Sequence, residues 1–210
     1  MSHYFERPSI LVEDSNGIHA ISSKSLLLKR RIIHLEEDIA GAAVNEIIRQ
    51  LILLGAQSGE PVTILIDTNG GSIQAGLQMI DVMEACPCII RTIALGNACS
   101  MGAVILAAGT PGHRAISSRS KVLLHEPLIG VGVSGSASRM ESIANDLKER
   151  RETINRMLAW YTGQDLATVQ EATSYNHWFT ADEARDFGLV DSVVADADLF
   201  AVISGGVNNA

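Results

Sequence analysis

The chain has 210 residues, of which 47% are hydrophobic and 4% aromatic, and its formal net charge is -8. This length and composition predict one compact domain with a core of small and aliphatic side chains. The acidic balance, without a long run of Lys or Arg, argues against nucleic acid or an anionic membrane as a partner. The cysteines Cys86, Cys88 and Cys99 have no metal-binding spacing, so we expect buried free thiols and neither a metal nor a cofactor.

The two ends of the chain are expected to lie outside the core. Residues 1–20 mix charges, proline and glycine with one short apolar patch, which predicts an N-terminal arm or axial hairpin. Residues 197–210 are expected to form a disordered tail. The longest uncharged apolar run, residues 101–109, is about half of a membrane span, and we see no targeting segment. We therefore expect a cytoplasmic protein.

Strands and helices alternate along residues 31–109. The acidic residues 36–38 are expected in the first turn of one helix, and another helix is expected over residues 72–84. Further on, a capping box at Thr180-x-x-Glu183 opens a helix that Gly188 ends. The alternation predicts an α/β fold with parallel strands and right-handed crossovers. The expected strands are residues 31–35, 62–66, 89–95, 114–116, 121–124 and 189–194.

Ser100 lies where one of these strands leads into a helix. It follows the small or polar run Gly96-Asn97-Ala98-Cys99, interpreted as a turn, and precedes small apolar residues typical of a buried helix. Free N–H groups at a helix N-terminus can stabilise an oxyanion, so this is a suitable place for a nucleophile. An ordinary serine N-cap would show the same local pattern. The hypothesis therefore needs support from elsewhere in the chain.

The segment after the strand at 121–124 combines a histidine, an extended stretch and a long helix. His125 follows the strand directly, and residues 128–136 alternate glycine with Ile, Val and Ser. Such a stretch has unpaired backbone groups, so we expect a peptide to pair with it. A helix is predicted over residues 138–161, opened by the capping box Ser138-x-x-Glu141. Its apolar stripe is too long for the core of a small domain, so we expect the helix to project and to pack against a neighbouring subunit.

Several short motifs follow one another in a fixed order. They are Asn69-Gly70-Gly71-Ser72, Gly96-x-x-x-Ser100-Met101-Gly102-Ala103, Val122-Leu123-Leu124-His125-x-Pro127, Thr162-Gly163-Gln164 and Gly188-Leu189-Val190-Asp191. Together they resemble the proteolytic subunit of the caseinolytic Clp protease family, over about residues 22–194. The resemblance implies a crotonase-like (ClpP) fold of repeated β-β-α units in a serine protease domain at residues 21–196. It also implies a projecting handle helix and strand, about residues 126–161, through which two stacked heptameric rings interlock.

The resemblance assigns chemical roles to four residues. Ser100 matches the family's nucleophile and His125 its general base, while the N–H groups of Gly71 and Met101 match its oxyanion hole. A serine hydroxyl is a weak nucleophile until an imidazole within reach accepts its proton, and the same imidazole then protonates the leaving amine. These roles imply a serine endopeptidase that cleaves peptides and unfolded proteins inside a ring-shaped chamber.

Substrate is expected to bind beside the glycine turn. Glycine at position 70 lets an extended peptide lie against the turn, while residues 128–134 pair with the other side of the peptide. The expected substrate-binding residues are Gly70, Ser72, Leu128 and Gly130. The family also implies a homo-oligomer, or a mixed ring with a paralogue, and an AAA+ unfoldase as a partner.

The chain departs from the family's pattern in three places. Counting back without a gap from Thr180, the third triad position, normally Asp, is Asn176. An amide oxygen still accepts the imidazole N–H, but it supplies no charge to stabilise the imidazolium. The handle loop at residues 130–137 is slightly longer. Positions where the family often has aromatic side chains for docking its unfoldase hold Thr63, Leu65, Ala85 and Ala115, which predicts weak docking.

Three other functions fit parts of the sequence. Ala98-x-Ser100-x-Gly102 approximates the nucleophile elbow of α/β-hydrolases, whose late histidine would then be His177. A crotonase-type acyl-CoA enzyme would use the two oxyanion N–H groups without Ser100 or His125. A weakly active or regulatory subunit of a mixed ring is favoured by Asn176 and by the altered docking positions.

Overall fold

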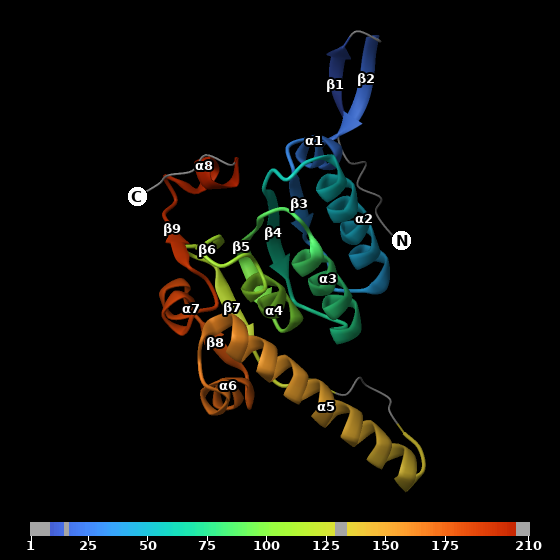
Figure 1. Cartoon of the computed structure of the whole chain (residues 1–210), viewed down its shortest axis with the longest axis vertical. Helices are drawn as coiled ribbons and strands as arrows, with labels where there is room; N and C mark the ends of the chain where they lie inside the picture. Colours follow the sequence, from blue (N-terminus) through green and yellow to red (C-terminus); the bar gives the residue numbers. More distant parts are fainter. Residues whose placement is uncertain (1–8, 15–16, 129–133, 205–210) are drawn as a thin grey trace, which may run out of the picture.

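The computed structural model describes residues 9–14, 17–128 and 134–204 (Figure 1). The strands are β1 (Ser9–Asp14), β2 (Gly17–Ser22), β3 (Ile32–Leu35), β4 (Val62–Thr68), β5 (Ile90–Cys99), β6 (Arg114–Ser117), β7 (Lys121–Leu124), β8 (His177–Phe179) and β9 (Ser192–Val194). The helices are α1 (Ser23–Lys29), α2 (Gly41–Gln57), α3 (Ile73–Ala85), α4 (Met101–Ala107), α5 (Ala137–Thr162), α6 (Leu166–Thr173), α7 (Ala181–Phe187) and α8 (Leu199–Ile203).

The main sheet is parallel in the order β3-β4-β5-β6-β9. β5 is 10 residues long and has two successive parallel neighbours, β6 beside its first half and β7 beside its end. β8 pairs with β7 in the antiparallel direction. The predicted α/β fold with parallel strands is therefore confirmed. β1 and β2 form a separate antiparallel hairpin that stands away from the sheet (Figure 1).

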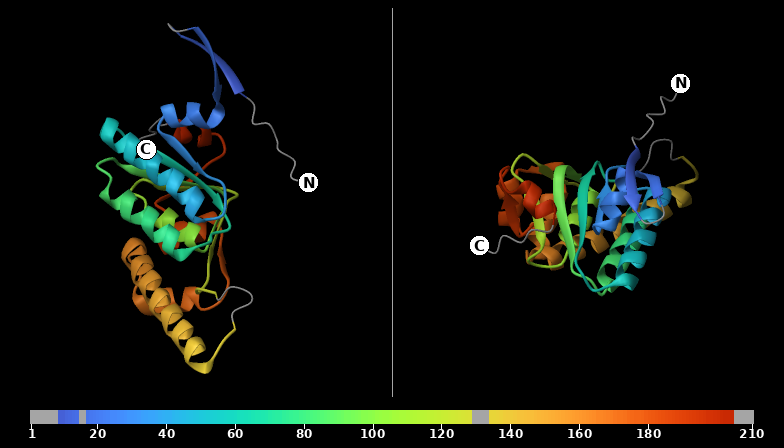
Figure 2. Two further views of the ribbon diagram at one scale, coloured as in Figure 1. Left: turned by 90° about the vertical axis from the view of Figure 1, so that its right-hand side faces the viewer. Right: turned by 90° about the horizontal axis from the view of Figure 1, so that it is seen from above.

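The helices α2, α3 and α4 cover one face of the sheet (Figures 1 and 2). α4 consists of small and aliphatic residues and is buried along its whole length, whereas α2 and α3 are each buried along one side. This difference follows from composition, because only a helix without polar side chains can be surrounded by the core. The same core fixes the C-terminal ends of β4 and β5, between which the candidate site lies.

α5 extends away from the rest of the molecule (Figures 1 and 2). Its buried residues, Ile154, Asn155 and Leu158, all lie in its C-terminal half. The course of the helix agrees with the one predicted over residues 138–161, but the predicted capping box at Ser138 is wrong. Ser136 is the N-cap, and its side chain accepts a hydrogen bond from the Arg139 N–H.

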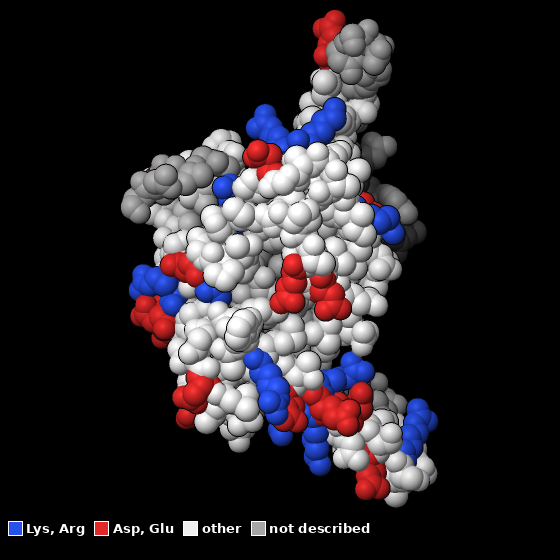
Figure 3. Space-filling model, in the orientation of Figure 1, with Lys and Arg blue, Asp and Glu red and all other residues white. Residues whose placement is uncertain are grey.

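Charged side chains of both signs are interspersed along α5 on the face shown in Figure 3. Some pair at helical spacing, with Arg150 2.7 Å from Asp146 and Arg156 2.6 Å from Glu152. Pairs of this kind support a helix that is surrounded by solvent in the single chain. No helix in the described ranges is both long and apolar enough to cross a membrane.

The start of α2 differs from the prediction. The helix begins at Gly41, so the acidic residues 36–38 precede it and do not form its first turn. The reason is a parallel bridge between Ile39 and Gly71, which keeps residue 39 out of the helix. This bridge connects the loop before α2 to the glycine turn after β4.

Two more elements differ from the prediction because of contacts with distant segments, whereas the predicted start and end of α7 are confirmed. β5 continues to Cys99 through the turn expected at residues 96–99, because β7 pairs with this part of the strand. α8 lies in the tail 197–210 that was expected to be disordered, and it forms because its aliphatic side chains pack on the sheet. The capping box of Thr180 and Glu183 at the start of α7 is confirmed, as is the left-handed cap at Gly188.

Candidate active site

Ser100 forms the corner between β5 and α4. Its φ of 55° and ψ of -120° are sparsely allowed for a non-glycine residue, and such a conformation costs roughly 1–3 kcal/mol and concentrates at functional sites. The Ser100 N–H donates to the Leu123 carbonyl at 2.8 Å, which holds the corner against β7. The Ser100 side chain makes no capping bond to α4. The geometry therefore disfavours the N-cap alternative and leaves the hydroxyl uncommitted among the described residues.

The glycine turn after β4 lies against this serine. Gly70 has a φ of 97°, and a Cβ at this position would lie 2.8 Å from the Ser100 Cβ. Gly71 has a φ of 148°, and a Cβ there would lie 2.4 Å from the Ile39 carbonyl oxygen. Both positions thus require glycine, one because of the serine and the other because of the backbone of residue 39.

Backbone hydrogen bonds fix the direction of the turn. The Ile39 N–H donates to the Gly70 carbonyl at 2.8 Å, and the Ser72 N–H donates to the Ile39 carbonyl at 2.7 Å. Since successive groups of an extended segment point to opposite sides, the Gly71 N–H points away from Ile39. Within the described ranges, the N–H groups of Gly71 and Met101 donate to no protein acceptor. Two free donors therefore lie next to the serine.

The sheet register places His125 and Asn176 at the same edge as Ser100. β7 is the neighbour of the end of β5, and β8 is the neighbour of β7. The register pairs Leu124 with His177, so the next residues along, His125 and Asn176, are opposite each other. Neighbouring strands are separated by about 4.8 Å. The gap-free count that selects Asn176 in the sequence agrees with this register.

The side chains at this edge are not joined to one another. His125 Nδ1 is buried and has no hydrogen-bond partner in the described part of the chain. Asn176 is exposed. A buried polar atom left without a partner costs about 1–3 kcal/mol, and catalytic hydrogen bonds are often long or poorly aligned before substrate binds. The fold thus brings the residues together without closing the chain of hydrogen bonds between them.

The expected substrate-binding residues have different surroundings. The Ser72 Oγ accepts the Ala75 N–H at 3.3 Å and caps α3, so this hydroxyl has a role in the fold. Leu128 is 73% exposed, and Gly130 falls outside the described residues. Most of the extended stretch expected to pair with substrate falls outside them as well.

An ion pair connects the candidate base to the projecting helix. Glu126 directly follows His125, and its carboxylate lies 3.1 Å from the Arg151 guanidinium of α5. Sequence analysis did not find this contact, because it depends on where a long helix passes a loop. The contact therefore connects α5 directly to the segment that holds the imidazole.

Cys99 precedes Ser100 but is not a competing nucleophile. Burial, and then the nearby charge of Asp67, raise the pKa of the Cys99 thiol above its ordinary value. Because the thiolate is the reactive form of cysteine, this side chain stays protonated and inert. The hydroxyl of the next residue is therefore the better candidate at this corner.

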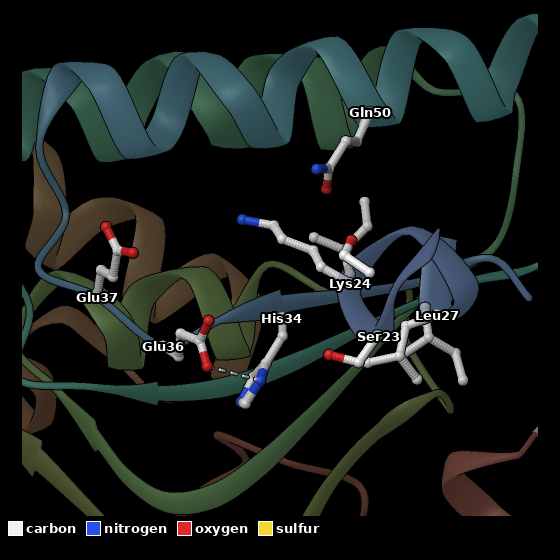
Figure 4. A pocket seen from close by; sticks show the side chains of 10 residues that line it. Ser23, Lys24, Leu27, His34, Glu36, Glu37 and Gln50 are labelled. Atoms are coloured by element: carbon white, nitrogen blue, oxygen red, sulfur yellow. Dashed lines mark ion pairs between the residues drawn. The ribbon is translucent and has the colours of Figure 1, made fainter. Parts of the chain in front are cut away.

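A cavity of about 490 Å³ lies elsewhere, between α1, β3 and α2 (Figure 4). It also contains a serine, a histidine and a carboxylate, with His34 Nδ1 3.3 Å from Glu36 Oε2. The Ser22 side chain caps α1 by accepting the Ser25 N–H at 3.0 Å. No serine of this cavity is hydrogen-bonded to His34 in the described part of the chain. The described residues therefore show no serine–histidine pair in this cavity.

The histidine of the α/β-hydrolase alternative has another contact. The His177 ring stacks on Phe179, with ring centroids 4.2 Å apart. Because side chains alternate along a strand, His177 points to the opposite side from Asn176. This arrangement disfavours the alternative in which His177 serves Ser100.

Known proteins are similar to this chain over most of its length. A family model described as Clp protease matches residues 15–197. The ATP-dependent Clp protease proteolytic subunit 1 of Salinibacter ruber (strain DSM 13855 / M31) is 34% identical over 198 residues, which cover 94% of this chain and 84% of that protein. The parallel α/β sheet with its projecting helix is consistent with the crotonase-like (ClpP) fold that the sequence predicts. The chain therefore belongs to the Clp protease family.

Proposed function

We propose that this chain is a proteolytic subunit of an ATP-dependent Clp protease and acts as a serine endopeptidase. One observation carries the proposal: a strained serine with an uncommitted hydroxyl lies beside two free backbone donors. A structural serine would not need this combination. Ser100 is the nucleophile, His125 the general base, and the N–H groups of Gly71 and Met101 form the oxyanion hole.

The reaction follows from these positions. His125 Nε2 accepts the proton of the Ser100 hydroxyl while Oγ bonds to the carbonyl carbon of the scissile peptide. The carbonyl oxygen becomes an oxyanion and accepts hydrogen bonds from Gly71 and Met101. The C–N bond then breaks as the imidazolium returns the proton to the leaving amine, which gives an acyl-serine. Water, deprotonated by the same imidazole, hydrolyses this ester and restores the serine.

Asn176 is proposed as the residue that orients His125. The His125 Nδ1 atom needs an acceptor because it is buried and unpartnered among the described residues, and Asn176 is its neighbour across β7 and β8. The amide oxygen would accept the Nδ1 proton and select the tautomer with a free Nε2. Unlike a carboxylate, it adds no charge to stabilise the imidazolium.

The substrate is proposed to be an extended peptide or an unfolded protein. Gly70 and Ser72 contact one side of the peptide, and Leu128 and Gly130 the other, so that the backbone runs past Ser100 between two hydrogen-bonding edges. Specificity then depends more on an extended backbone than on a deep side-chain pocket. An AAA+ unfoldase would supply such substrates.

The assembly is proposed to be two stacked heptameric rings held together through α5. Buried residues of this helix occur only in its C-terminal half, and Met140 in the first half is 37% exposed. Met140→Glu combined with Leu147→Glu should break the large particle into smaller species in sedimentation velocity, because both charges lie on the expected interface. Ile154 is unsuitable for this purpose, since it is buried within the chain itself. A particle of unchanged size would contradict the role of α5.

A fluorophosphonate probe tests the catalytic proposal. The probe should label Ser100 in the intact protein, and Ser100→Ala should abolish the labelling. Ser23→Ala, in the cavity of Figure 4, is the matched control and should leave labelling unchanged. Labelling that persists in Ser100→Ala would contradict the assignment.

A second function, a weakly active or regulatory subunit in a mixed ring, is favoured by a specific observation. His125 Nδ1 has no partner in the described residues, and Asn176 is exposed. Native mass measurement of the chain alone and with a co-expressed paralogue separates the two functions. A regulatory subunit should form the full particle only with the paralogue, and its Ser100→Ala variant should then retain most of the activity of the mixed particle.

A further inference from the structure

The face of the sheet away from α2 and α3 has an apolar cluster of its own. The buried members of this cluster are Ile32, Leu65, Ile93, Ala115 and Val194. Register places Leu65 of β4 beside Ile93 of β5, and Ile93 beside Ala115 of β6. These residues form a continuous apolar row across three strands. We call this cluster the second face.

α8 covers the second face. Its residues Leu199, Val202 and Ile203 pack against the cluster, while Phe200 between them is 80% exposed. The spacing of the packed residues is that of one side of a helix. α8 follows β9 at the end of the molecule that carries the β1–β2 hairpin (Figure 1).

The contact between α8 and the second face is weakly anchored. The helix has 5 residues, no buried residue and no side-chain bond at its N-cap. A helix this short is not stable by itself in water. Outside the apolar contact, Asp196 accepts a hydrogen bond from Ser118 at 2.9 Å and forms an exposed ion pair with Arg119, and an exposed pair contributes about 0–1 kcal/mol. α8 can therefore leave the face without disrupting the main core.

We propose that α8 is a strap that competes with an outside apolar segment for the second face. The segment would present aliphatic side chains at helical or turn spacing and would replace Leu199, Val202 and Ile203. Leu65 and Ala115 belong both to this face and to the positions at which the sequence lacks the family's aromatic docking residues. Ala115, whose side chain is small, belongs to the cluster against which α8 packs. The identity of the segment as a loop of an AAA+ unfoldase rests on the proposed function.

The consequence is self-inhibition of docking. A ligand that needs a site occupied by another segment binds with an apparent affinity reduced by the fraction of time that the site is free. If α8 covers the face for nine-tenths of the time, release of α8 should strengthen binding by about tenfold. The structure thus predicts stronger docking from a variant with fewer apolar contacts.

Full-length variants test this prediction. Leu199→Asp with Val202→Asp puts two charges into the apolar contact and should release α8. Phe200→Asp adds a charge to the same helix on its exposed side and is the matched control. The probe is a fluorescein-labelled peptide with the sequence of residues 196–204, and its binding is followed by fluorescence anisotropy. The double variant should bind the peptide about tenfold more tightly than the wild type and Phe200→Asp do.

Two further samples separate docking from general exposure of apolar surface. A labelled peptide that carries the Val202→Asp change should not bind the double variant. Adding Leu95→Asp at the edge of the second face should abolish binding of the unchanged peptide. If the double variant unfolds in circular dichroism, Leu199→Ser with Val202→Ser replaces it.

The outcomes distinguish this proposal from the proposed function. A folded double variant that binds the peptide no better than wild type would overturn the strap. Peptide binding does not require catalysis, so a tenfold gain together with a Ser100 that no fluorophosphonate labels would support the strap and refute the protease. Equal gains in Phe200→Asp would also overturn the strap, because that side chain does not contact the face.

Discussion

The two sides of the candidate site are built differently. On the serine side, Ser100, the glycine turn and α4 are fixed by backbone hydrogen bonds and by contacts too close for a Cβ. On the histidine side, the Nδ1 atom of His125 has no partner among the described residues and Asn176 is exposed. The next residue, Glu126, forms an ion pair with Arg151 of α5. One side is complete within the single chain, while the other depends on groups that face solvent.

This difference shows where regulation can act. A donor held by buried backbone keeps its position whether or not subunits associate, because moving it would disrupt the core. An imidazole held by exposed side chains can be misaligned at little energetic expense, and in the proposed assembly a neighbouring subunit on α5 would align it. We therefore expect changes on the serine side to be severe and changes on the histidine side to be graded.

The largest effect is expected from Gly71→Ala. A Cβ at this position would lie 2.4 Å from the Ile39 carbonyl oxygen, so the turn must move and its N–H leaves the oxyanion site. Loss of one such donor lowers kcat by about 10²–10³. Peptidase assays on the purified particle measure the effect. Gly112→Ala is the control, since Gly112 also has a positive φ, 81°, but nothing within 4 Å of the added Cβ.

Stability should be most sensitive at Asp191. Its carboxylate accepts hydrogen bonds from Arg114 Nε at 3.1 Å and Nη2 at 2.6 Å, and Arg114 also reaches the carbonyls of Ala107 and Tyr161. The pair thus joins the end of α4 to the end of α5. Asp191→Asn leaves a buried guanidinium uncompensated and should cost about 3 kcal/mol in the free energy of unfolding.

The pH dependence of this effect has a definite sign. Burial of Asp191 opposes ionisation, but hydrogen bonds and charge from Arg114 outweigh it and lower the pKa of Asp191 below its ordinary 3.8. The stabilisation is therefore complete above pH 3.8 and is lost as the pH falls through the lower pKa of the folded state. Urea unfolding of wild type and Asp191→Asn should converge there. Asp196→Asn removes an exposed pair instead and should change stability by less than about 1 kcal/mol. A similar loss in both variants would contradict the special role of Asp191.

Much of the fold could be predicted from sequence, because the patterns were local. β7 begins and ends at the residues predicted for it, and the long helix was found from its apolar stripe. The prediction failed where distant segments decide local structure. Gly96 and Asn97 have turn chemistry, yet β7 supplies a partner and the strand continues. At the start of α5, Ser136 and Ser138 are both acceptable N-caps, and the sequence does not rank them.

The same division applies to the candidate site, where local motifs were informative and contacts between distant segments were not. Ser100, His125 and the glycine turn could be located because each follows a strand in a recognisable motif. The support that Ile39 gives to the turn could not be found, since it comes from backbone atoms. The relation between His125 and Asn176 depends on side-chain rotamers at an exposed edge, which no sequence pattern encodes. The sequence therefore indicates which residues form the candidate site better than it indicates their contacts.

Asn176→Asp should raise activity. An acid-to-amide change in a serine triad lowers kcat by about 10⁴, and part of this loss should be recovered when a carboxylate faces His125 Nδ1. We expect an increase of at least about tenfold in kcat, because the charge stabilises the imidazolium in the transition state. Asn45→Asp places the same charge on an exposed position of α2 and should leave kcat unchanged. Flat or lower activity in Asn176→Asp would show that another group orients the imidazole.

The smallest effect is expected from Arg151→Gln, which tests whether α5 aligns the base. The Arg151 and Glu126 side chains are 51% and 42% exposed, so their attraction is worth less than about 1 kcal/mol, or about fivefold in rate. A loss of kcat within this limit, with KM unchanged, would indicate a positioning role.

Salt and a second variant identify the cause of that loss. The difference between Arg151→Gln and wild type should shrink as ionic strength rises, since solvent ions screen an exposed pair. Arg156→Gln breaks a pair with Glu152 inside α5 and does not touch the segment after His125, so its kcat should match that of the wild type. Equal losses in the two variants would mean that they act on the helix or the assembly rather than on the imidazole. A loss confined to Arg151→Gln would place the connection between the handle and the base at this one ion pair.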